Sequence, residues 1–390
     1  MNWVTKLSKN FLALFIGIII AFTLSEGILR IYNPFDFRVK GDKIILPVNK
    51  KYVIKKDRSQ KKHSKFDETI IHTKNSLGFR GEEPPANFSE YLTIITVGGS
   101  TTECTFLSDG KTWTDQLGKK LKTNFKDIWI NNAGFDGHST FGHLVLMEDY
   151  IVKLKPDIVL FLLGANEQGG EVNEQDEAIM RTKYVFSSPK AFLKSLANHS
   201  EVFSLALNAY RYWKAVSIGV EHAELDFENY YKDIDLNYYL ADETIKLDKE
   251  NLEITRIIAK GLESRLENLI KISKDNNIEP ILITQPTLSG DVIDDVTNVN
   301  FSFTKISWQI LEILNDATRR VGEKNNVLVI DLAREMPKSS RYYYDWLHYT
   351  NEGAEKVAEI IYNNTLNYIA EKYSSYLRVP SKEKKENTHE

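Results

Sequence analysis

Short apolar runs alternate with amphipathic stretches over most of the chain. A short, apolar, β-branched run predicts a buried strand, and a longer stretch with apolar positions every three to four residues predicts a helix. The predicted strands cover Tyr91–Val97, Ile128–Asn131, Ile158–Leu163, Pro280–Thr284 and Val327–Ile330, and the predicted helices include Trp113–Leu121, Leu252–Asn276 and Thr350–Tyr368.

Strands that are apolar throughout and are separated by helices predict a parallel sheet covered on both faces. The predicted fold class is therefore α/β, a flavodoxin-like, three-layer, doubly wound parallel sheet. In such sheets the functional site lies beyond the carboxyl ends of the strands. Functional residues are thus expected in the loops that follow the strands.

The N-terminal segment differs from the rest because Phe11–Leu24 contains no charged residue. This run is short for a hydrocarbon core of about 30 Å, but apolar residues up to Ile31 extend it. We interpret residues 11–32 as a transmembrane anchor, preceded by a short tail, residues 1–10. A cleaved signal peptide is the alternative, although no small-x-small cleavage pattern follows the apolar run.

Basic residues flank the predicted anchor on both sides. Lys6 and Lys9 precede it, whereas Arg30 stands near its C-terminal end and Arg38, Lys40 and Lys43 follow, so the positive-inside rule is nearly neutral. A short tail and a large C-terminal domain favour export of that domain. The predicted localisation is a single-pass membrane protein with its main domain outside the cytoplasm.

Residues 33–90 are predicted to form a basic juxtamembrane stalk. Lysines stand in pairs there, as at Lys50–Lys51 and Lys61–Lys62. We interpret these charges as a solvated surface, because no apolar face accompanies them. Contact with anionic lipid head groups or with an acidic glycan is the alternative.

Residues 91–372 form the predicted main domain. Within it, residues 169–250 interrupt the strand–helix rhythm and are too long for a plain loop, so we predict a helical insertion. Helical patches occur there at Ala191–Leu196 and Phe203–Val216. Residues 373–390 end in a charged, polar stretch and are predicted to be a disordered tail.

The composition excludes several classes of protein. With 42% hydrophobic and 27% charged residues among 390, the chain is expected to fold around a core. A net charge of −4, with no basic groove lined by aromatic residues, gives no argument for nucleic acid as a partner. Cys104 is the only cysteine, so no intrachain disulfide is possible, and no metal or organic cofactor is implied.

The loop after the first predicted strand contains Gly98, Gly99 and Ser100. Two glycines allow a sharp turn, which would expose the Ser100 hydroxyl at the carboxyl edge of the sheet. The N–H groups of a following helix could then stabilise a developing oxyanion. A plain strand-to-helix turn, with Ser100 or Thr101 as N-cap, is the alternative.

The loops after the second and third predicted strands carry two further candidates. Gly137 can bring its N–H against a ligand because it has no side chain. Asn166 can donate a neutral, directional hydrogen bond to an oxyanion. Each also has a local alternative: a turn glycine for Gly137, and an Asx turn or helix cap for Asn166.

Asp345 and His348 lie on one loop just before the last predicted helix. Attack by a serine hydroxyl needs a base for its proton and a carboxylate that orients the base and stabilises the imidazolium. A single Asp-x-x-His is more often a cap and a surface histidine. Here it is the fourth polar group at one edge of the same predicted sheet, which favours a catalytic centre.

The four loops resemble the signature blocks of the SGNH (GDSL-like) serine hydrolase superfamily, in the same order and with compatible spacing. The resemblance implies that Ser100 is the nucleophile and that His348 and Asp345 are its base and acid. It also implies an oxyanion hole formed by the N–H groups of Ser100 and Gly137 and by the Asn166 amide.

The resemblance covers residues 91–166 and 279–370, and it leaves out the anchor, the stalk and the insertion. The surrounding pattern favours Gly137 over Gly134 as the oxyanion glycine. Asn75–Gly81 is also similar to a segment that precedes the serine in membrane-anchored members, although a simple turn explains it nearly as well.

Two positions depart from the family pattern. Gly99 stands where the family name implies aspartate, and Tyr349 stands where proline is common. Neither departure removes a catalytic group.

The resemblance implies a membrane-anchored serine esterase that acts on small acyl esters through an acyl-serine intermediate. The O-acetyl groups of a surface glycan are a candidate substrate, and an acylated glycan or lipid is the expected partner. The alternatives are an O-acyltransferase of cell-surface polysaccharide and a non-catalytic glycan-binding relative. The complete set of five groups argues against the last. Oligomeric state is not predicted.

Three other features near the site carry simpler interpretations. Cys104 is expected to be a buried small side chain and not a second nucleophile. His138 is interpreted as a loop residue, and contact with the substrate is the alternative. The aromatic residues around the base either stack on sugar rings or wall off the site; they are Tyr342, Tyr343, Tyr344, Trp346 and Tyr349.

Overall fold

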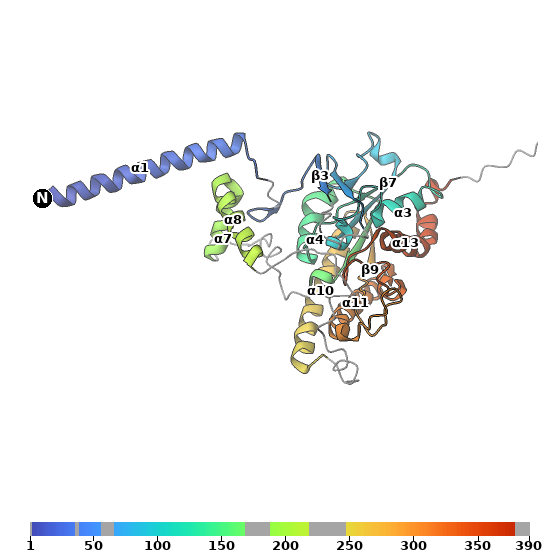
Figure 1. Cartoon of the computed structure of the whole chain (residues 1–390). Coiled ribbons are helices and arrows are strands. Elements are labelled where there is room, and N and C mark those ends of the chain that lie inside the picture. The colour runs from blue at the N-terminus through green and yellow to red at the C-terminus, as the bar shows by residue number, and fades with distance from the viewer. Residues whose placement is uncertain (1, 36–38, 56–65, 168–187, 218–246, 379–390) are drawn as a thin grey trace, which may run out of the picture. The chain divides into compact units, whose positions relative to one another are not determined.

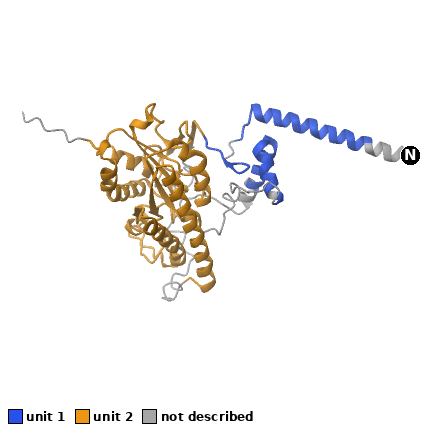
Figure 2. Cartoon of the chain, turned by 180° about the vertical axis from the view of Figure 1, so that it is seen from behind, with its two compact units in different colours: residues 1–47, 174–222 blue, residues 48–173, 223–390 orange. Residues whose placement is uncertain are grey.

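The computed structural model describes residues 2–35, 39–55, 66–167, 188–217 and 247–378. The chain divides into two compact units, shown in different colours in Figure 2. Residues 1–47 and 174–222 form the first unit, and residues 48–173 and 223–390 form the second. Most of the predicted insertion that the structure describes therefore groups with the N-terminal segment.

The second unit is built on a six-stranded sheet with the strand order β10-β9-β8-β6-β7-β5. The first five strands in this order run parallel, and β5 lies antiparallel at the edge beside β7. This is the strand order of flavodoxin-like doubly wound sheets, so the predicted fold class is confirmed. The bounds are β5 Arg80–Gly81, β6 Leu92–Gly98, β7 Ile128–Asn132, β8 Ile158–Leu163, β9 Glu279–Thr284 and β10 Val329–Ile330.

Helices cover both faces of the sheet, as Figure 1 shows. On one face α3 packs against α13, and on the other α10 packs against α11 and α4. Every residue of β6 and β8 is buried, which explains why both strands are almost entirely apolar. The helices are α2 Ser100–Glu103, α3 Trp113–Leu121, α4 Thr140–Leu146, α5 Val152–Leu154, α10 Lys249–Asp275, α11 Lys305–Asn325, α12 Leu332–Glu335 and α13 Asn351–Lys372.

Helix α11 was not among the sequence-based predictions. Its buried face carries Leu311, Leu314, Thr318 and Val321, at the spacing of one side of a helix. Polar residues interrupt this face, because Asn315 and Thr318 are buried as well. The interruption weakens the apolar pattern from which a helix is predicted.

The segment predicted as a solvated stalk contains strands. β3 (Lys50–Lys55) pairs with β4 (Thr69–Lys74) in an antiparallel two-stranded sheet, and β5 joins the main sheet. In β4 alternate residues are buried, including His72 and Lys74. Polar side chains on the buried face of β4 make this strand resemble a solvated stretch in the sequence.

The predicted disordered tail also begins later than expected. Ser374–Tyr376 form a 3₁₀ turn, and the Arg378 N–H donates to the carbonyl of Asn124 at 2.8 Å. The predicted polar stretch beyond residue 378 lies outside the described residues.

The first unit contains α1 (Asn2–Ile31), α7 (Pro189–His199) and α8 (Glu201–Ser217), with the short strands β1 (Val39–Lys40) and β2 (Lys43–Ile44). Both predicted helical patches of the insertion fall within α7 and α8. Among the described residues, Lys9–Ile31 is long and apolar enough to cross a membrane, a property that a signal sequence shares.

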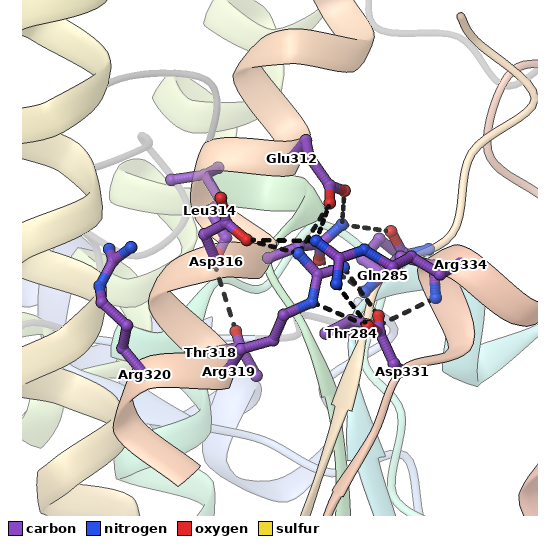
Figure 3. A network of polar contacts seen from close by, with 12 residues as sticks. Thr284, Gln285, Glu312, Leu314, Asp316, Thr318, Arg319, Arg320, Asp331 and Arg334 are labelled. Carbon is purple, nitrogen blue, oxygen red and sulfur yellow. Dashed lines mark hydrogen bonds and ion pairs between the residues drawn. The ribbon is translucent and has the colours of Figure 1, made fainter. Parts of the chain in front are cut away.

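A polar network ties α11 to the end of β10 (Figure 3). The Arg319 guanidinium donates to Asp331, at 2.7 and 3.0 Å, and also reaches Glu312 and Asp316. Burial raises the pKa of Asp331, but the hydrogen bonds and charge of Arg319 outweigh it, so the pKa is lowered. The network fixes the start of α12, where Asp331 is the N-cap residue.

We expect Arg319→Leu to lower the thermal midpoint by about 5 °C at pH 7, because the three carboxylates then keep only the more exposed Arg334 guanidinium as a partner. A carboxylate whose folded pKa is lowered contributes stability above its unfolded pKa and loses it as the pH falls through the folded value. The difference from the unmodified chain should therefore shrink as the pH falls below about 4. Thermal unfolding at several pH values measures it.

Arg320→Leu is the matched control. The Arg320 side chain is 57% exposed, and its guanidinium bonds Glu263 at the surface, so we expect a much smaller change. Equal losses in the two variants would contradict a structural role for the Arg319 network.

Candidate active site

The loop after β6 places Ser100 at the carboxyl edge of the sheet. β6 ends at Gly98, Gly99 is the N-cap position, and α2 begins at Ser100. The helix is only one turn long and ends at Glu103, and its C-cap residue, Cys104, has a left-handed backbone with φ of 53°. The Ser100 side chain thus lies at the beginning of α2, and the residue is only 9% exposed.

The loop before α13 brings His348 to Ser100. The His348 Nε2 lies 2.7 Å from the Ser100 Oγ, and its Nδ1 lies 2.7 Å from the Asp345 Oδ2. The Tyr344 ring stacks on the imidazole at 5.5 Å between centroids, and the Tyr344 N–H donates to the His348 carbonyl. The imidazole is therefore held between a hydroxyl and a carboxylate.

Asp345 is positioned by the backbone of its own loop. Its Oδ1 accepts hydrogen bonds from the N–H groups of Leu347 at 2.8 Å and His348 at 2.7 Å. Burial raises the pKa of Asp345, but the charge and hydrogen bonds of His348 and the Leu347 N–H outweigh it, so the pKa is lowered. The carboxylate is consequently ionised over the whole neutral range.

Asn166 and Gly137 lie in the loops after β8 and β7. The Asn166 Nδ2 donates to the His138 carbonyl at 2.8 Å, which joins the loop after β8 to the loop after β7. Gly137, just before that carbonyl, has φ of 76°, a backbone conformation that favours glycine. A Cβ on Gly99 would stand 2.4 Å from the Asn166 Nδ2. The Asn166 amide thus lies directly against the backbone beside Ser100.

Gly134, the less favoured of the two glycines, contacts α2. A Cβ there would stand 2.3 Å from the Glu103 nitrogen. The Asn132 side chain bridges the same region, because its Nδ2 donates to the Thr102 carbonyl and its Oδ1 accepts from the Gly134 N–H. Gly134 therefore allows α2 to pack closely against the loop after β7.

A small cavity of about 10 Å³, room for about one water molecule, lies beside these residues at the ends of β6 and β8. Ser100 and His348 do not line it. Its walls include Gly99, His138, His143, Asn166 and Gln285. Among the described residues, no group of three or more histidine, cysteine or acidic side chains is placed to hold a metal ion.

Sequence reasoning missed a buried polar cluster behind α2. The Arg80 guanidinium, 1% exposed, donates to the carbonyls of Glu103, Cys104 and Leu107 at 2.7 to 2.8 Å, and it pairs with Asp109. Arg80 therefore satisfies carbonyls at the C-terminal end of the one-turn helix that begins with Ser100. The signal was present in the Asn75–Gly81 segment, which contains this arginine.

The Glu103 carboxylate belongs to the same cluster. It pairs with the buried Lys74 ammonium at 2.9 Å, and it accepts a hydrogen bond from the Asp136 N–H at 2.6 Å. Asp136 directly precedes Gly137, so the carboxylate holds the loop that carries this glycine. Burial, with the nearby charges of Arg80 and Lys74, lowers the pKa of His72 in β4 to about 3. His72 is therefore neutral at pH 7.

Cys104, Tyr343 and Tyr349 are buried. The Cys104 thiol is buried, which raises its pKa to about 12, so its environment is that of an inert packed side chain. Tyr343 and Tyr349 are buried against each other. These two rings therefore form part of the core and are not available to stack on a sugar.

The sequence matches the model of the family described as "GDSL-like Lipase/Acylhydrolase family" over residues 96–356. The chain belongs to this family. The predicted superfamily is thereby confirmed, and ester hydrolysis is the activity that the family implies. The matched range includes all five predicted site residues, whose individual roles stay predictions.

This GDSL-like hydrolase is also similar to solved structures, at low sequence identity. An acetylxylan esterase from Geobacillus stearothermophilus is 14% identical, with a TM-score of 0.40 over 70% of this chain and 93% of its own. An α/β-hydrolase from the metagenome of Lake Arreo, Spain, is also 14% identical, with a TM-score of 0.40, covering 70% and 94%. Comparison with curated protein sequences gave no significant match.

Close approach at Gly99 generates a prediction for this hydrolase. Asn166→Ala should lower kcat by about 10²–10³-fold if the amide stabilises an oxyanion. Gly99→Ala should produce a similar loss, because the added methyl displaces the amide. The double variant should be no slower than either single variant, since both changes remove the same interaction. Initial rates on an aryl acetate measure this, and losses that multiply would contradict it.

The buried ion pair between Lys74 and Glu103 leads to a prediction about stability. Lys74→Met or Glu103→Gln should each cost about 3 kcal/mol of unfolding free energy, because each leaves a buried charge without its partner. The double variant should recover most of the loss. Urea unfolding of the full chain in detergent measures all three. The surface pair Lys324–Glu267 is the control, and the corresponding changes there should have no measurable effect on the unfolding free energy. Additive losses for Lys74→Met and Glu103→Gln would refute an energetic coupling between the two buried side chains.

Proposed function

We propose that this chain is a membrane-anchored serine esterase that hydrolyses short-chain acyl esters, with Ser100 as nucleophile, His348 as general base and Asp345 as the acid that orients it. The observation that carries the proposal is the continuous chain of hydrogen-bond distances from the Ser100 Oγ through the imidazole to the Asp345 carboxylate, 2.7 Å at each step. Nucleophile and base are within reach for proton transfer without any movement.

The proposed reaction has two halves. His348 takes the Ser100 proton at Nε2 while the Ser100 Oγ attacks the ester carbonyl carbon. The tetrahedral intermediate collapses, the C–O bond to the alcohol breaks, and the alkoxide takes the proton from His348. Water then attacks the acyl-serine with His348 as base, and the carboxylic acid leaves as Ser100 regains its proton.

Negative charge on the substrate oxygen would be stabilised by the N–H groups of Ser100 and Gly137 and by the Asn166 amide. An asparagine amide has two N–H donors. One of them bonds the His138 carbonyl, which fixes the plane of the amide, and this leaves the second for the oxyanion. A fixed donor is worth more than a mobile one because it needs no reorganisation during the reaction.

The preference for short acyl groups is supported by the space beside the nucleophile. Ser100 is largely buried, and the cavity beside it, at about 10 Å³, has room for about one water molecule, which leaves little space for a long acyl chain. We therefore propose acetyl and similarly short esters, with O-acetyl groups on a surface glycan as the natural class. The anchor is α1, whose apolar stretch Lys9–Ile31 can cross a membrane.

The test uses the purified full chain in detergent and a series of aryl esters of increasing acyl length. Acetate should be cleaved fastest. Ser100→Ala and His348→Ala should each lower kcat by at least about 10⁴-fold, and a fluorophosphonate probe should label Ser100 only when His348 is present. Full esterase activity in Ser100→Ala would sink the proposal, and faster cleavage of long esters would refute the short-chain preference.

The same assay has a defined pH dependence. Because the pKa of Asp345 is lowered, its carboxylate stays ionised on mild acidification and does not contribute to the loss of activity. Activity should therefore fall on the acid side as a single protonation. Asp345→Asn should lower kcat by about 10³–10⁴-fold at every pH. An acid limb that required two protonations would contradict this assignment.

A further inference from the structure

The last turns of α1 are bound by the helical insertion. The Glu26 carboxylate accepts hydrogen bonds from the N–H groups of Glu201 at 3.0 Å and Val202 at 3.1 Å, and from the Ser200 hydroxyl at 2.7 Å. A helix N-terminus carries unpaired N–H groups and a partial positive charge, both of which favour a carboxylate. Glu26 therefore caps α8 from a different helix.

Two further contacts join the same elements. The Arg30 guanidinium donates to the His199 carbonyl at the end of α7, at 2.6 Å. The Phe22 and Phe203 rings lie 5.6 Å apart between centroids. Phe22 is the third-to-last residue of the uncharged run that ends at Leu24. If α1 spans a membrane, α8 thus begins where hydrocarbon gives way to head groups.

One face of α8 is polar and forms hydrogen bonds with the segment that follows α1 in the sequence. The Asn208 Nδ2 donates to the Val39 carbonyl at 2.9 Å, and the Arg211 guanidinium donates to the Gly41 carbonyl at 3.2 Å. These carbonyls belong to β1 and to the turn that follows it. The insertion thus binds both the end of α1 and the segment after it.

A second face of α8 carries aromatic residues in line with the contact to α1. Tyr210 follows Phe203 by seven residues, which places both on one side of the helix, and Trp213 follows Tyr210 by three. Tyr210 is 56% exposed and Trp213 is 67% exposed. Figure 1 shows the α7–α8 pair beside the C-terminal end of α1, extending to one side of that helix.

We propose that α8 is a membrane-interfacial helix whose Phe203–Tyr210–Trp213 face contacts the phospholipid bilayer surface. The inference rests on the proposed function of α1 as a membrane anchor. Tyrosine and tryptophan concentrate at the head-group level because one part of each ring system is apolar and another forms hydrogen bonds. Amphipathic helices with such a face lie in the plane of the interface.

Continuity with the anchor favours lipid over another protein as the occupant of this face. Phe203 is the first residue of the aromatic face and already contacts the proposed membrane-spanning helix at Phe22. Glu26 and Arg30 bring two charges to the same level, and both are neutralised locally, by the α8 N-terminus and by their own ion pair at 2.8 Å. The end of α1 can therefore lie at the interface without exposing an unpaired charge to lipid.

The test uses the full chain reconstituted into vesicles of phosphatidylcholine and phosphatidylglycerol. A single environment-sensitive fluorophore is attached at Trp213→Cys, and its emission is quenched either by aqueous iodide or by a nitroxide carried on the lipid. Cys104 is buried with a raised pKa, so the unsubstituted chain should label poorly and provides the background. Tyr210→Cys is a second position on the same face.

Two matched positions make the result decisive. Ile293→Cys, at a site 64% exposed in the second unit, reports an aqueous surface, and Ile18→Cys, 58% exposed in the middle of α1, reports the bilayer interior. We expect iodide to quench position 213 at least about threefold less than position 293, and the lipid nitroxide to quench positions 213 and 18. Esterase activity of each labelled variant verifies folding.

The two failures are distinguishable. If lipid quenches position 18 while positions 210 and 213 behave like position 293, the interfacial helix is refuted and the anchor stands. Protection of positions 210 and 213 from iodide without lipid quenching would show a protein contact and would equally overturn the proposal. If position 18 escapes the lipid quencher, the anchor itself is refuted, and this inference with it.

Discussion

The arrangement at the carboxyl edge of the sheet depends on a single steric constraint, the lack of a side chain at position 99. Asn166, from the end of β8, occupies the space where a Cβ of Gly99 would stand, and the same amide holds the loop after β7 through the His138 carbonyl. The ends of three adjacent strands meet there. An aspartate at this position, as the family name implies, would need a different path for the asparagine.

The Asp345 and His348 side chains, in contrast, are positioned mainly by hydrogen bonds. Asp345 is held by two N–H groups of its own loop, and the imidazole is clamped between that carboxylate, the Tyr344 ring and the Ser100 hydroxyl. Behind the nucleophile, Arg80 and Glu103 complete the support. The strands β4 and β5, which precede β6 in the chain, thus support the site through Lys74 and Arg80, although none of their residues lines the nearby cavity.

Much of this could be predicted from the sequence, for a physical reason. Buried parallel strands must be apolar on both faces, so strands such as Ile158–Leu163 can be predicted from their apolar runs. The topology of the sheet then brings the loops that follow these strands together. The burial of residues in and around β4 and β5 could not be predicted from the sequence, because several of the buried side chains are charged. Lys74, Arg80 and Glu103 satisfy one another only after folding, and an isolated charged residue in a sequence indicates solvent.

In the helical insertion, too, contacts between residues far apart in the sequence could not be predicted from the sequence. Its helices α7 and α8 were predicted, but their association with α1 depends on a pairing between residues about 175 positions apart, Glu26 with Ser200, Glu201 and Val202. No periodicity within either segment encodes such a contact. A carboxylate near the end of an apolar helix indicates only that something must neutralise or solvate it.

Both edges of the main sheet end in strands of only two residues, β5 on one side and β10 on the other. An edge strand presents unpaired N–H and C=O groups to which the strand of another molecule can add, and a short edge offers very few of them. The brevity of β5 and β10 therefore protects the sheet against lateral self-association through strand pairing.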